Sequence, residues 1–414
     1  MTTGLAEQQL QCAAVLLRDV RAAAAGSDDF SLHLDLALAD LEFGRALGEP
    51  SPAAPRRSLA VAADLLRAAR AVPPWLYGGA AQAGWTMVQL ARATGVQARG
   101  LAPLDEVVGR WIAEYPDTCD VDLPRGLLGL GVYGLAHPEP GVRERFSSGV
   151  LDVVEARAEH DCDGMFVRLV ANAPRQADGS AGCTVVGVAH GCAGLVSYLA
   201  SVAGADLSCS ARAQSLLAAA VRWLLRQRDP VGGGAPPLWR DSDYAPSRVT
   251  WCYGDPGIAL ALAVAAEVTS SATIRAAAAE LASAAVARHP EESGVIDACL
   301  CHGAAGLVWF GRRVLDTGAT AADRQQAARC IAHWSRYLIE QRHAGPLQFF
   351  RGSGTDRNSS FLEGDAGVAL ALLQAATGTR PAWEQLLLGT PVSTDPWAEA
   401  RREVGRAPGG CPTP

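Results

Sequence analysis

The stretch Gly254-Asp-Pro-Gly-Ile-Ala-Leu-Ala-Leu-Ala-Val264 joins two glycines, three residues apart, to an almost entirely apolar run. The same element, Gly-x-x-Gly or a close variant, recurs along the chain. Its five clear copies begin at Gly126, Gly191, Gly254, Gly303 and Gly364. An eroded copy at 78–85 has Gln82 in place of a glycine, and a more doubtful copy at 31–37 lacks both glycines. The chain therefore holds about seven repeats, a pattern typical of repeat architectures.

The segments between the glycine elements have helical periodicity. Leu217, Val221 and Leu224 recur at i, i+4 and i+7 before Asp229-Pro230 ends the pattern. A similar spacing recurs at Ile331, Trp334 and Leu338. We therefore predict that each repeat is a helical hairpin, in which an inner helix begins at the glycine element and is apolar nearly all round, while its partner is amphipathic. Such hairpins favour an all-α fold of two concentric rings.

The composition narrows the class of protein. With 414 residues, 49% of them hydrophobic and 19% charged, the chain can bury a large core. Its apolar stretches fall short of the roughly 18 to 20 residues that cross a bilayer, and its N-terminus lacks the pattern of a secretory signal. We expect a soluble cytoplasmic protein without a membrane span, which could join a membrane-bound biosynthetic or export complex.

Cysteine content and charge exclude further classes. The 11 cysteines are odd in number and scattered, which indicates a reduced compartment rather than a disulfide framework. The net charge is −7 and the basic residues are spread thinly. Nucleic-acid binding therefore has no electrostatic support.

Two stretches interrupt the repeats, at 229–246 and at 344–360, and both are rich in glycine and other loop-forming residues. We predict surface loops there, near a substrate entrance. Neither stretch is long enough for an extra domain. The prediction is a single domain over 1–414, with a core at about 30–390 and ragged ends at 1–25 and 395–414.

Alignment of the repeats on their first glycine brings polar residues into register. Cys252 and Cys301 both stand two residues before a glycine, and His190, Tyr253 and His302 stand one residue before. If the repeats close into a ring and each inner helix starts at its glycine, these side chains converge at one end of the central cavity. Two thiolates and an imidazole suit tetrahedral Zn²⁺ and leave its fourth position open, as in a catalytic site.

We predict that most of the cysteines only pack in the core, because cysteine is among the most buried residue types. Cys299 competes with Cys301 as a ligand, since it lies only two residues away, but it breaks register with Cys252. We therefore prefer Cys301. The cysteines assigned to packing are Cys12, Cys119, Cys162, Cys183, Cys192, Cys209, Cys330 and Cys411.

Three further polar residues are candidates. His190 alone would be an ordinary core histidine, but its register beside the metal set predicts a general acid or base. Asp122 and Arg248 lie four and six residues before their glycines, where each alone would more often form a salt bridge or belong to a loop.

Three motifs together resemble the LanC-type lanthionine synthetases, the lanthipeptide cyclases. They are Gly187-Val-Ala-His-Gly-Cys-Ala-Gly194, Ser247-Arg-Val-Thr-Trp-Cys-Tyr-Gly254 and Cys301-His-Gly303. The resemblance continues at 122–129, 361–367 and 383–388, and it covers about residues 30–390. The combination is far more specific than any one motif.

The resemblance implies an α/α toroid of about seven inner and seven outer helices, with one zinc ion per chain. Cys252, Cys301 and His302 would hold the zinc. His190 would transfer the proton, with Asp122, Arg248 and Tyr253 as supporting groups in the active site.

The implied reaction adds cysteine thiols to dehydroalanine or dehydrobutyrine and so forms thioether rings. Its substrate would be a dehydrated precursor peptide, with leader and core. A separate dehydratase is the implied partner, because the sequence has no kinase-type glycine loop or catalytic aspartate.

Some residues depart from the family pattern, all in the N-terminal half. Pro124-Arg125 replaces apolar and small residues and places an extra guanidinium near the cavity mouth, and Gln82 replaces a repeat glycine. We expect altered substrate handling rather than lost catalysis.

Three alternatives remain open. The protein could add glutathione to dehydroamino acids, as relatives of the family are thought to do. It could resemble the protein prenyltransferase-like toroids, whose zinc ligands include an aspartate. It could also be a non-catalytic scaffold that binds peptides within a biosynthetic complex.

Overall fold

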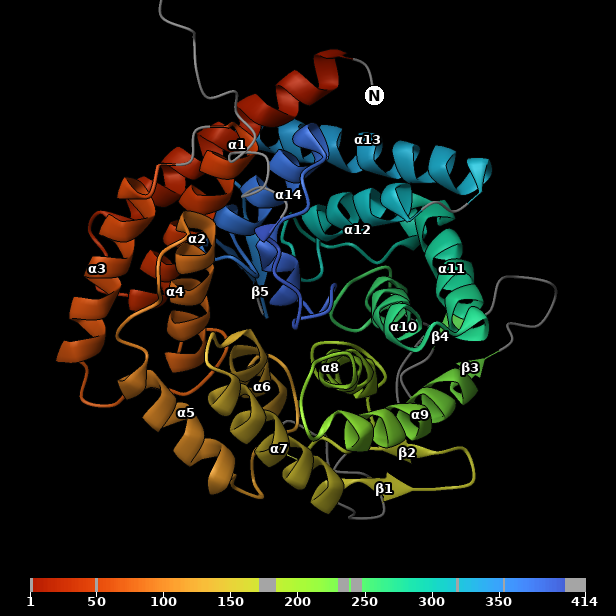
Figure 1. Ribbon diagram of the computed structural model, residues 1–414. Helices are drawn as coiled ribbons and strands as arrows, with labels where there is room; N and C mark the ends of the chain where they lie inside the picture. Colours follow the sequence, from red (N-terminus) through yellow and green to blue (C-terminus); the bar gives the residue numbers. More distant parts are fainter. Residues whose placement is uncertain are drawn as a thin grey trace, which may run out of the picture.

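The computed structural model describes residues 3–48, 51–170, 184–229, 238–239, 248–317, 320–352 and 354–398. Within these ranges the chain forms fourteen α-helices in two concentric rings (Figure 1). The predicted α/α toroid is confirmed. The seven inner helices are α2 (Phe30–Ala46), α4 (Ala80–Thr94), α6 (Leu127–Ala136), α8 (Cys192–Ala203), α10 (Asp255–Thr269), α12 (Ala304–Asp316) and α14 (Asp365–Thr377).

The outer helices alternate with the inner ones along the chain. They are α1 (Thr3–Ala24), α3 (Ala53–Ala68), α5 (Ala102–Ala113), α7 (Pro140–Arg157), α9 (Ser210–Arg226), α11 (Ala272–Ala287) and α13 (Ala321–Ala344). Two short 3-10 helices, η1 (Pro290–Glu292) and η2 (Ala382–Gln385), complete the helical part of the described chain. Among these helices, none combines the length and the hydrophobicity that crossing a membrane requires.

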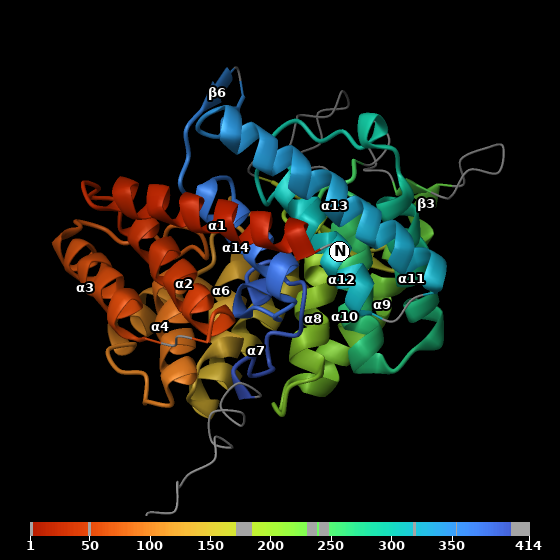
Figure 2. The same cartoon turned by 90° about the horizontal axis from the view of Figure 1, so that it is seen from above.

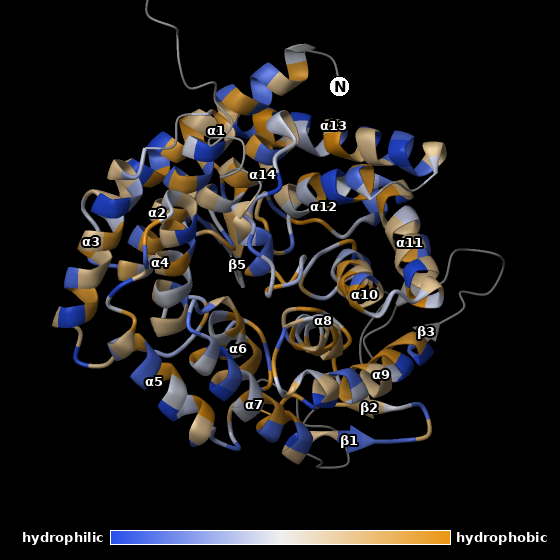
Figure 3. Cartoon of the chain, viewed as in Figure 1, coloured by the Kyte–Doolittle hydropathy of each residue, from blue (hydrophilic) through white to orange (hydrophobic). Residues whose placement is uncertain are grey.

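Hydropathy separates the two rings as the periodicity predicts. All ten residues of α6 are buried, and α8 and α10 are drawn mostly in hydrophobic colours in Figure 3, whereas α3 and α5 carry hydrophilic residues. On the outer helix α9 the residues Leu217, Val221 and Leu224 are buried. The inner helices thus form the core, and each outer helix covers it with one apolar face.

The glycine elements start the inner helices for a steric reason. The first N–H of α10, from Asp255, donates to the carbonyl of Arg248, six residues before the repeat glycine Gly254. A Cβ at Gly254 would lie 1.9 Å from that carbonyl oxygen, so no larger residue fits. The loop carbonyl satisfies an N–H that has no partner within the helix. The same bond to the sixth residue before the glycine caps α4, α6, α8, α12 and α14.

The N-terminal segment differs from the prediction. Residues 1–25 were expected to be a ragged end, but α1 is a 22-residue helix that packs along α14 as the outer partner of the last inner helix. Gln9 donates to Ser335 Oγ at 2.8 Å, and Asp19 pairs with Arg342 at 2.7 Å, so α13 is also bound (Figure 2 shows α1 and α13 together). The start of the chain therefore closes the ring. At the other end, 399–414 lie outside the described residues.

The first repeat is joined to its neighbours by side chains. Asp35 of α2 accepts the Phe361 N–H at 2.8 Å and the Gln82 Nε2–H at 2.6 Å. Gln82 Oε1 in turn accepts the Gly78 N–H at 2.7 Å and the Ser31 hydroxyl at 3.2 Å. Gln82 replaces a repeat glycine, and its side chain therefore links two repeats at the point where the glycine pattern erodes.

The two predicted loops contain short strands. β3 (Arg228–Asp229) pairs with β4 (Leu238–Trp239), while most of 229–246 lies outside the described residues. Within 344–360 the chain forms an antiparallel hairpin of β5 (Phe349–Arg351) and β6 (Gly354–Asp356), so the expectation of a plain loop was wrong there. β6 projects beyond the helices at one end of the ring (Figure 2). A third pair joins β1 (Glu159–His160) to β2 (Met165–Phe166).

Stability should fall as pH rises through neutrality. Burial raises the pKa values of Asp35, Glu42 and Asp365, at the α2 and α14 seam, to about 7 each. A carboxyl with a raised folded-state pKa holds its proton longer in the folded than in the unfolded chain, so its contribution is present at low pH and lost through about pH 7. We expect the free energy of unfolding, from denaturant titration, to decrease between about pH 5 and 8.

The Glu42→Gln variant tests this prediction. Glutamine keeps the acceptor for the Ala382 N–H and removes the titrating group. The pH-dependent loss should shrink by up to about 3 kcal/mol, the value that the Glu42 shift allows. A wild-type curve that rises over this range, or one that Glu42→Gln leaves unchanged, would contradict the assignment.

Candidate metal and active site

Main-chain hydrogen bonds connect the repeats at the residue two before the first glycine. We call this series the inter-repeat chain. Its links run from Tyr77 N to Pro124 O (3.4 Å), Leu123 N to Ala189 O (2.9 Å), Ala189 N to Cys252 O (3.2 Å), Cys252 N to Cys301 O (3.4 Å) and Cys301 N to Leu362 O (3.0 Å). Pro124 has no N–H, so Leu123 donates in its place. The two candidate cysteine ligands are thus neighbours joined through their own backbones.

The structure brings the predicted metal set together. The ligand atoms of Cys252, Cys301 and His302 all lie within 4.8 Å of one another. Cys252 and Cys301 are 5% and 7% exposed, and the His302 side chain is 19% exposed, so the set lies in a nearly closed site that remains open at the imidazole.

The two thiols of the metal set shift each other's pKa values in opposite directions. Hydrogen bonding from Cys301, and then from His302, holds the pKa of the Cys252 thiol well below its usual value. The same bond to Cys252, together with burial, raises the pKa of Cys301 well above its usual value. Two sulfurs and one imidazole are a donor set that Zn²⁺ binds, so these residues fit the metal that the sequence predicts.

A second group lies against the first and shares His302 with it. The ligand atoms of Asp297, Cys299 and His302 also lie within 4.8 Å of one another. Cys299 Sγ accepts the backbone N–H of His302 at 3.3 Å, and burial raises the pKa of its thiol to about 11. The Cys299 sulfur therefore helps to hold the backbone of His302 in place. The sequence analysis did not single out Asp297, although it stands six residues before its glycine, in the register of Arg248.

His190 and Asp122 form a hydrogen-bonded pair. His190 Nδ1 lies 2.8 Å from Asp122 Oδ2, and the Asp122 side chain is 3% exposed. Burial alone would lower the pKa of His190, but the hydrogen bond and charge of Asp122 raise it above its usual value. The ring of Tyr253 stacks on the imidazole at 5.4 Å between centroids. Because Tyr253 directly follows Cys252, the pair lies beside the metal set.

Comparisons with known proteins identify the family of the chain and a solved structure with the same fold. The sequence profile of the family described as lanthionine synthetase C-like protein matches residues 75–388, more than half of the chain. The chain belongs to this family. Among solved structures, nisin cyclase superposes with a TM-score of 0.66 over 94% of this chain and 98% of its own, at 17% sequence identity, which shows a shared fold. No curated protein sequence matches the chain.

Two arginines were expected near the site, Arg125 at the cavity mouth and Arg248 as a supporting group in the active site. Arg248 is exposed, and the stem of its side chain lies over Gly294, where a Cβ would come within 3.1 Å of Arg248 Cγ. Arg125 is also exposed, and its backbone N–H donates to Asp122 Oδ1 at 3.1 Å. Arg125 thereby fixes the carboxylate that holds His190, while the catalytic role of the Arg248 guanidinium stays a prediction.

Apolar side chains border the polar groups of this family member. Val170, Tyr253, Ile296 and Phe350 are 41 to 50% exposed. The Phe350 N–H donates to Asp297 at 2.9 Å, the Val170 N–H donates to Asp120 at 2.5 Å, and Ile296 directly precedes Asp297. We call these four residues the apolar rim. Exposed apolar groups around a polar centre are what a peptide substrate would contact.

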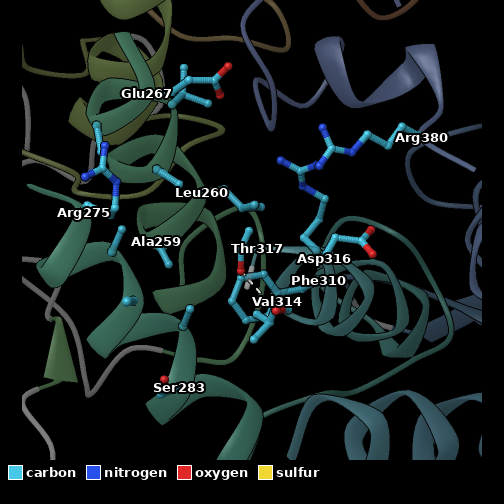
Figure 4. A pocket seen from close by; sticks show the side chains of 17 residues that line it. Ala259, Leu260, Glu267, Arg275, Ser283, Phe310, Val314, Asp316, Thr317 and Arg380 are labelled. Atoms are coloured by element: carbon cyan, nitrogen blue, oxygen red, sulfur yellow. Dashed lines mark hydrogen bonds between the residues drawn. The ribbon is translucent and has the colours of Figure 1, made fainter. Parts of the chain in front are cut away.

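A separate cavity of about 570 Å³ lies between α10, α11 and α12 (Figure 4). Small residues such as Ala259, Ala263 and Ala282 line it, together with Arg275 and Arg380. None of the predicted site residues contributes to it. The cavity faces the later turns of α10, whereas Cys252 precedes the start of that helix, so it is a different site from the metal set.

Proposed function

We propose that this chain is a zinc-dependent lanthipeptide cyclase, which adds cysteine thiols to dehydroalanine or dehydrobutyrine within a dehydrated precursor peptide. The observation that carries this proposal is the position of the His190 and Asp122 pair beside the Cys252, Cys301 and His302 set. Membership of the lanthionine synthetase C-like family supports it. A separate dehydratase would supply the substrate.

The reaction is a net addition without oxidation or reduction. The thiol gives up its proton and its sulfur forms a bond to Cβ of the dehydro residue. The Cα=Cβ π bond breaks, and its electron pair forms the enolate, which then gains a proton at Cα. Zn²⁺ held by Cys252, Cys301 and His302 would lower the pKa of an arriving thiol, which is about 8.5 in free cysteine, and so supply thiolate at neutral pH. The remaining tasks are to place the dehydro residue, to stabilise the enolate and to deliver the proton.

His190 is suited to deliver the proton. Because Nδ1 is hydrogen-bonded to Asp122, the opposite nitrogen, Nε2, is the one that can exchange a proton with substrate. The hydrogen bond and charge of Asp122 raise the pKa of His190, which favours the protonated ring, so His190 can act as a general acid toward Cα. Stacking on Tyr253 limits rotation of the imidazole.

The enolate would form in a positive electrostatic field. Three inner helices begin directly after site residues. Helix α8 begins two residues after His190, α10 three residues after Cys252, and α12 two residues after His302. Helix N-termini stabilise negative charge nearby, by about 0.3 to 1 kcal/mol each. Arg248 would add to this field if its guanidinium turns toward the substrate.

The direct test is ring formation by the purified, zinc-loaded protein. Cyclisation leaves the mass of a dehydrated peptide unchanged, so the free thiol is labelled with N-ethylmaleimide and counted by mass spectrometry. We expect the label to disappear from a peptide that carries one cysteine and one dehydroalanine. A thiol that stays available while the protein holds one zinc ion would contradict the proposal.

Excess glutathione in the same assay separates the cyclase from the glutathione-adding alternative. A cyclase should still close the ring with the cysteine of the peptide, because the tethered thiol has a high effective concentration. A glutathione adduct as the main enzymatic product would instead favour the alternative. Binding of the peptide without either product would favour the scaffold.

A further inference from the structure

The carboxylate of Asp297 lies beside the metal set and accepts several hydrogen bonds. Its Oδ1 accepts the Cys299 N–H at 2.9 Å, and its Oδ2 accepts the Phe350 N–H at 2.9 Å. The same Oδ2 lies 3.4 Å from Nε2 of His302. The Asp297 side chain is 3% exposed. Two main-chain donors from different segments therefore fix this carboxylate against the imidazole.

We propose that Asp297 is a positioning residue, which receives the Nε2–H of His302 and thereby leaves Nδ1 as the metal-binding nitrogen. An imidazole has two nitrogens, and the neutral ring carries its proton on only one of them. A carboxylate placed at Nε2 stabilises the proton there. Such outer carboxylates orient metal-bound histidines in other proteins and make the ligand more basic. This inference rests on the proposed metal set.

The same atoms could also be interpreted as a second metal position. Asp297, Cys299 and His302 include an aspartate, as the zinc set of the prenyltransferase-like alternative would. The geometry favours the positioning role, because both Asp297 oxygens are already oriented by backbone N–H groups and Oδ2 faces Nε2 of His302. A zinc content of two ions per chain would indicate the second position instead.

Asp297 also connects the metal set to the apolar rim. Phe350 lies on β5, its backbone bonds to Asp297, and its side chain is 43% exposed. One main-chain hydrogen bond thus joins β5 to the carboxylate that orients His302. Loss of Asp297 should therefore weaken metal binding and, to a smaller extent, shift the position of Phe350.

The Asp297→Asn variant of the full chain tests the proposal. Its amide can donate to Nε2, which would move the ring proton to Nδ1, the nitrogen that should bind the metal. We expect zinc affinity, measured by competition with a chromophoric chelator, to fall about 10- to 100-fold. The visible spectrum of the cobalt-substituted protein should change as well. The matched control is Asp40→Asn, which removes a buried carboxylate paired with Arg21 and should leave zinc affinity unchanged.

A second measurement needs no variant. Long-range ¹H–¹⁵N NMR of the zinc-loaded wild-type protein should show His302 with its proton on Nε2. A proton on Nδ1, two zinc ions per chain, or equal zinc affinity in Asp297→Asn and wild type would overturn the inference while leaving the cyclase proposal intact. Wild-type protein that binds no zinc would overturn both.

Discussion

Replacing Cys301 by alanine should remove zinc and ring formation together. Zinc content should drop from about one ion per chain to almost none, because only one thiolate and one imidazole remain. At neutral pH about 3% of a thiol with a pKa of about 8.5 is ionised, and loss of positioning adds to that deficit. Ring formation should therefore slow by more than about 100-fold. Metal analysis and the thiol-labelling assay measure the two effects.

The neighbouring Cys299→Ala variant is the control for this result. Cys299 is also buried and lies two residues away, but it is not part of the Cys252, Cys301 and His302 set. It should keep one zinc ion and most of the activity, with some loss of stability. If Cys299→Ala lost the metal and Cys301→Ala kept it, the ligand assignment would be wrong.

His190→Ala should separate chemistry from metal binding. This variant should keep one zinc ion per chain, because His190 is not part of the donor set. The rate of ring formation should fall by about 10² to 10⁴, the usual contribution of a general acid or base. A time course of thiol loss under saturating enzyme gives this rate directly.

The product of His190→Ala carries additional information. If His190 delivers the proton to one face of Cα, any residual product should contain both Cα configurations, since solvent would then supply the proton. Asp122→Asn should have a smaller effect in the same direction, because it removes only the partner that holds the ring. Wild-type rates in His190→Ala would rule out the proton-transfer role.

The glycine elements made most of the toroid predictable. A Cβ at Gly254 or Gly257 would lie 1.9 or 2.0 Å from a loop carbonyl oxygen, so the close approach leaves a signature in the sequence. The same register located Cys252, Cys301 and His302, because each repeat presents its loop in the same way. Because every repeat has the same close backbone contact, the glycines recur at a fixed position and can be recognised from a single sequence.

The parts that were missed depend on single contacts. The packing of α1 on α14 joins residues more than 340 positions apart, and no local pattern in residues 3–24 predicts this contact. Asp35 and Gln82 link the first repeats through side chains, without the glycines that mark the others. Asp297 shares its register with Arg248, but a carboxylate at a loop position has many ordinary roles. Only the folded chain shows that it faces His302.

The inter-repeat chain has a consequence for protein engineering. Its hydrogen bonds involve only the main chain. The positions of residues 189, 252, 301 and 362 therefore do not depend on which side chains these residues carry. Ala189 and Leu362 occupy positions equivalent to the two cysteines without contributing a donor atom. A histidine, cysteine or aspartate introduced at either position would therefore have a backbone that is already held in line with the two cysteines. The toroid could therefore serve as a scaffold for new metal chemistries, chosen by exchanging side chains at a few equivalent sites.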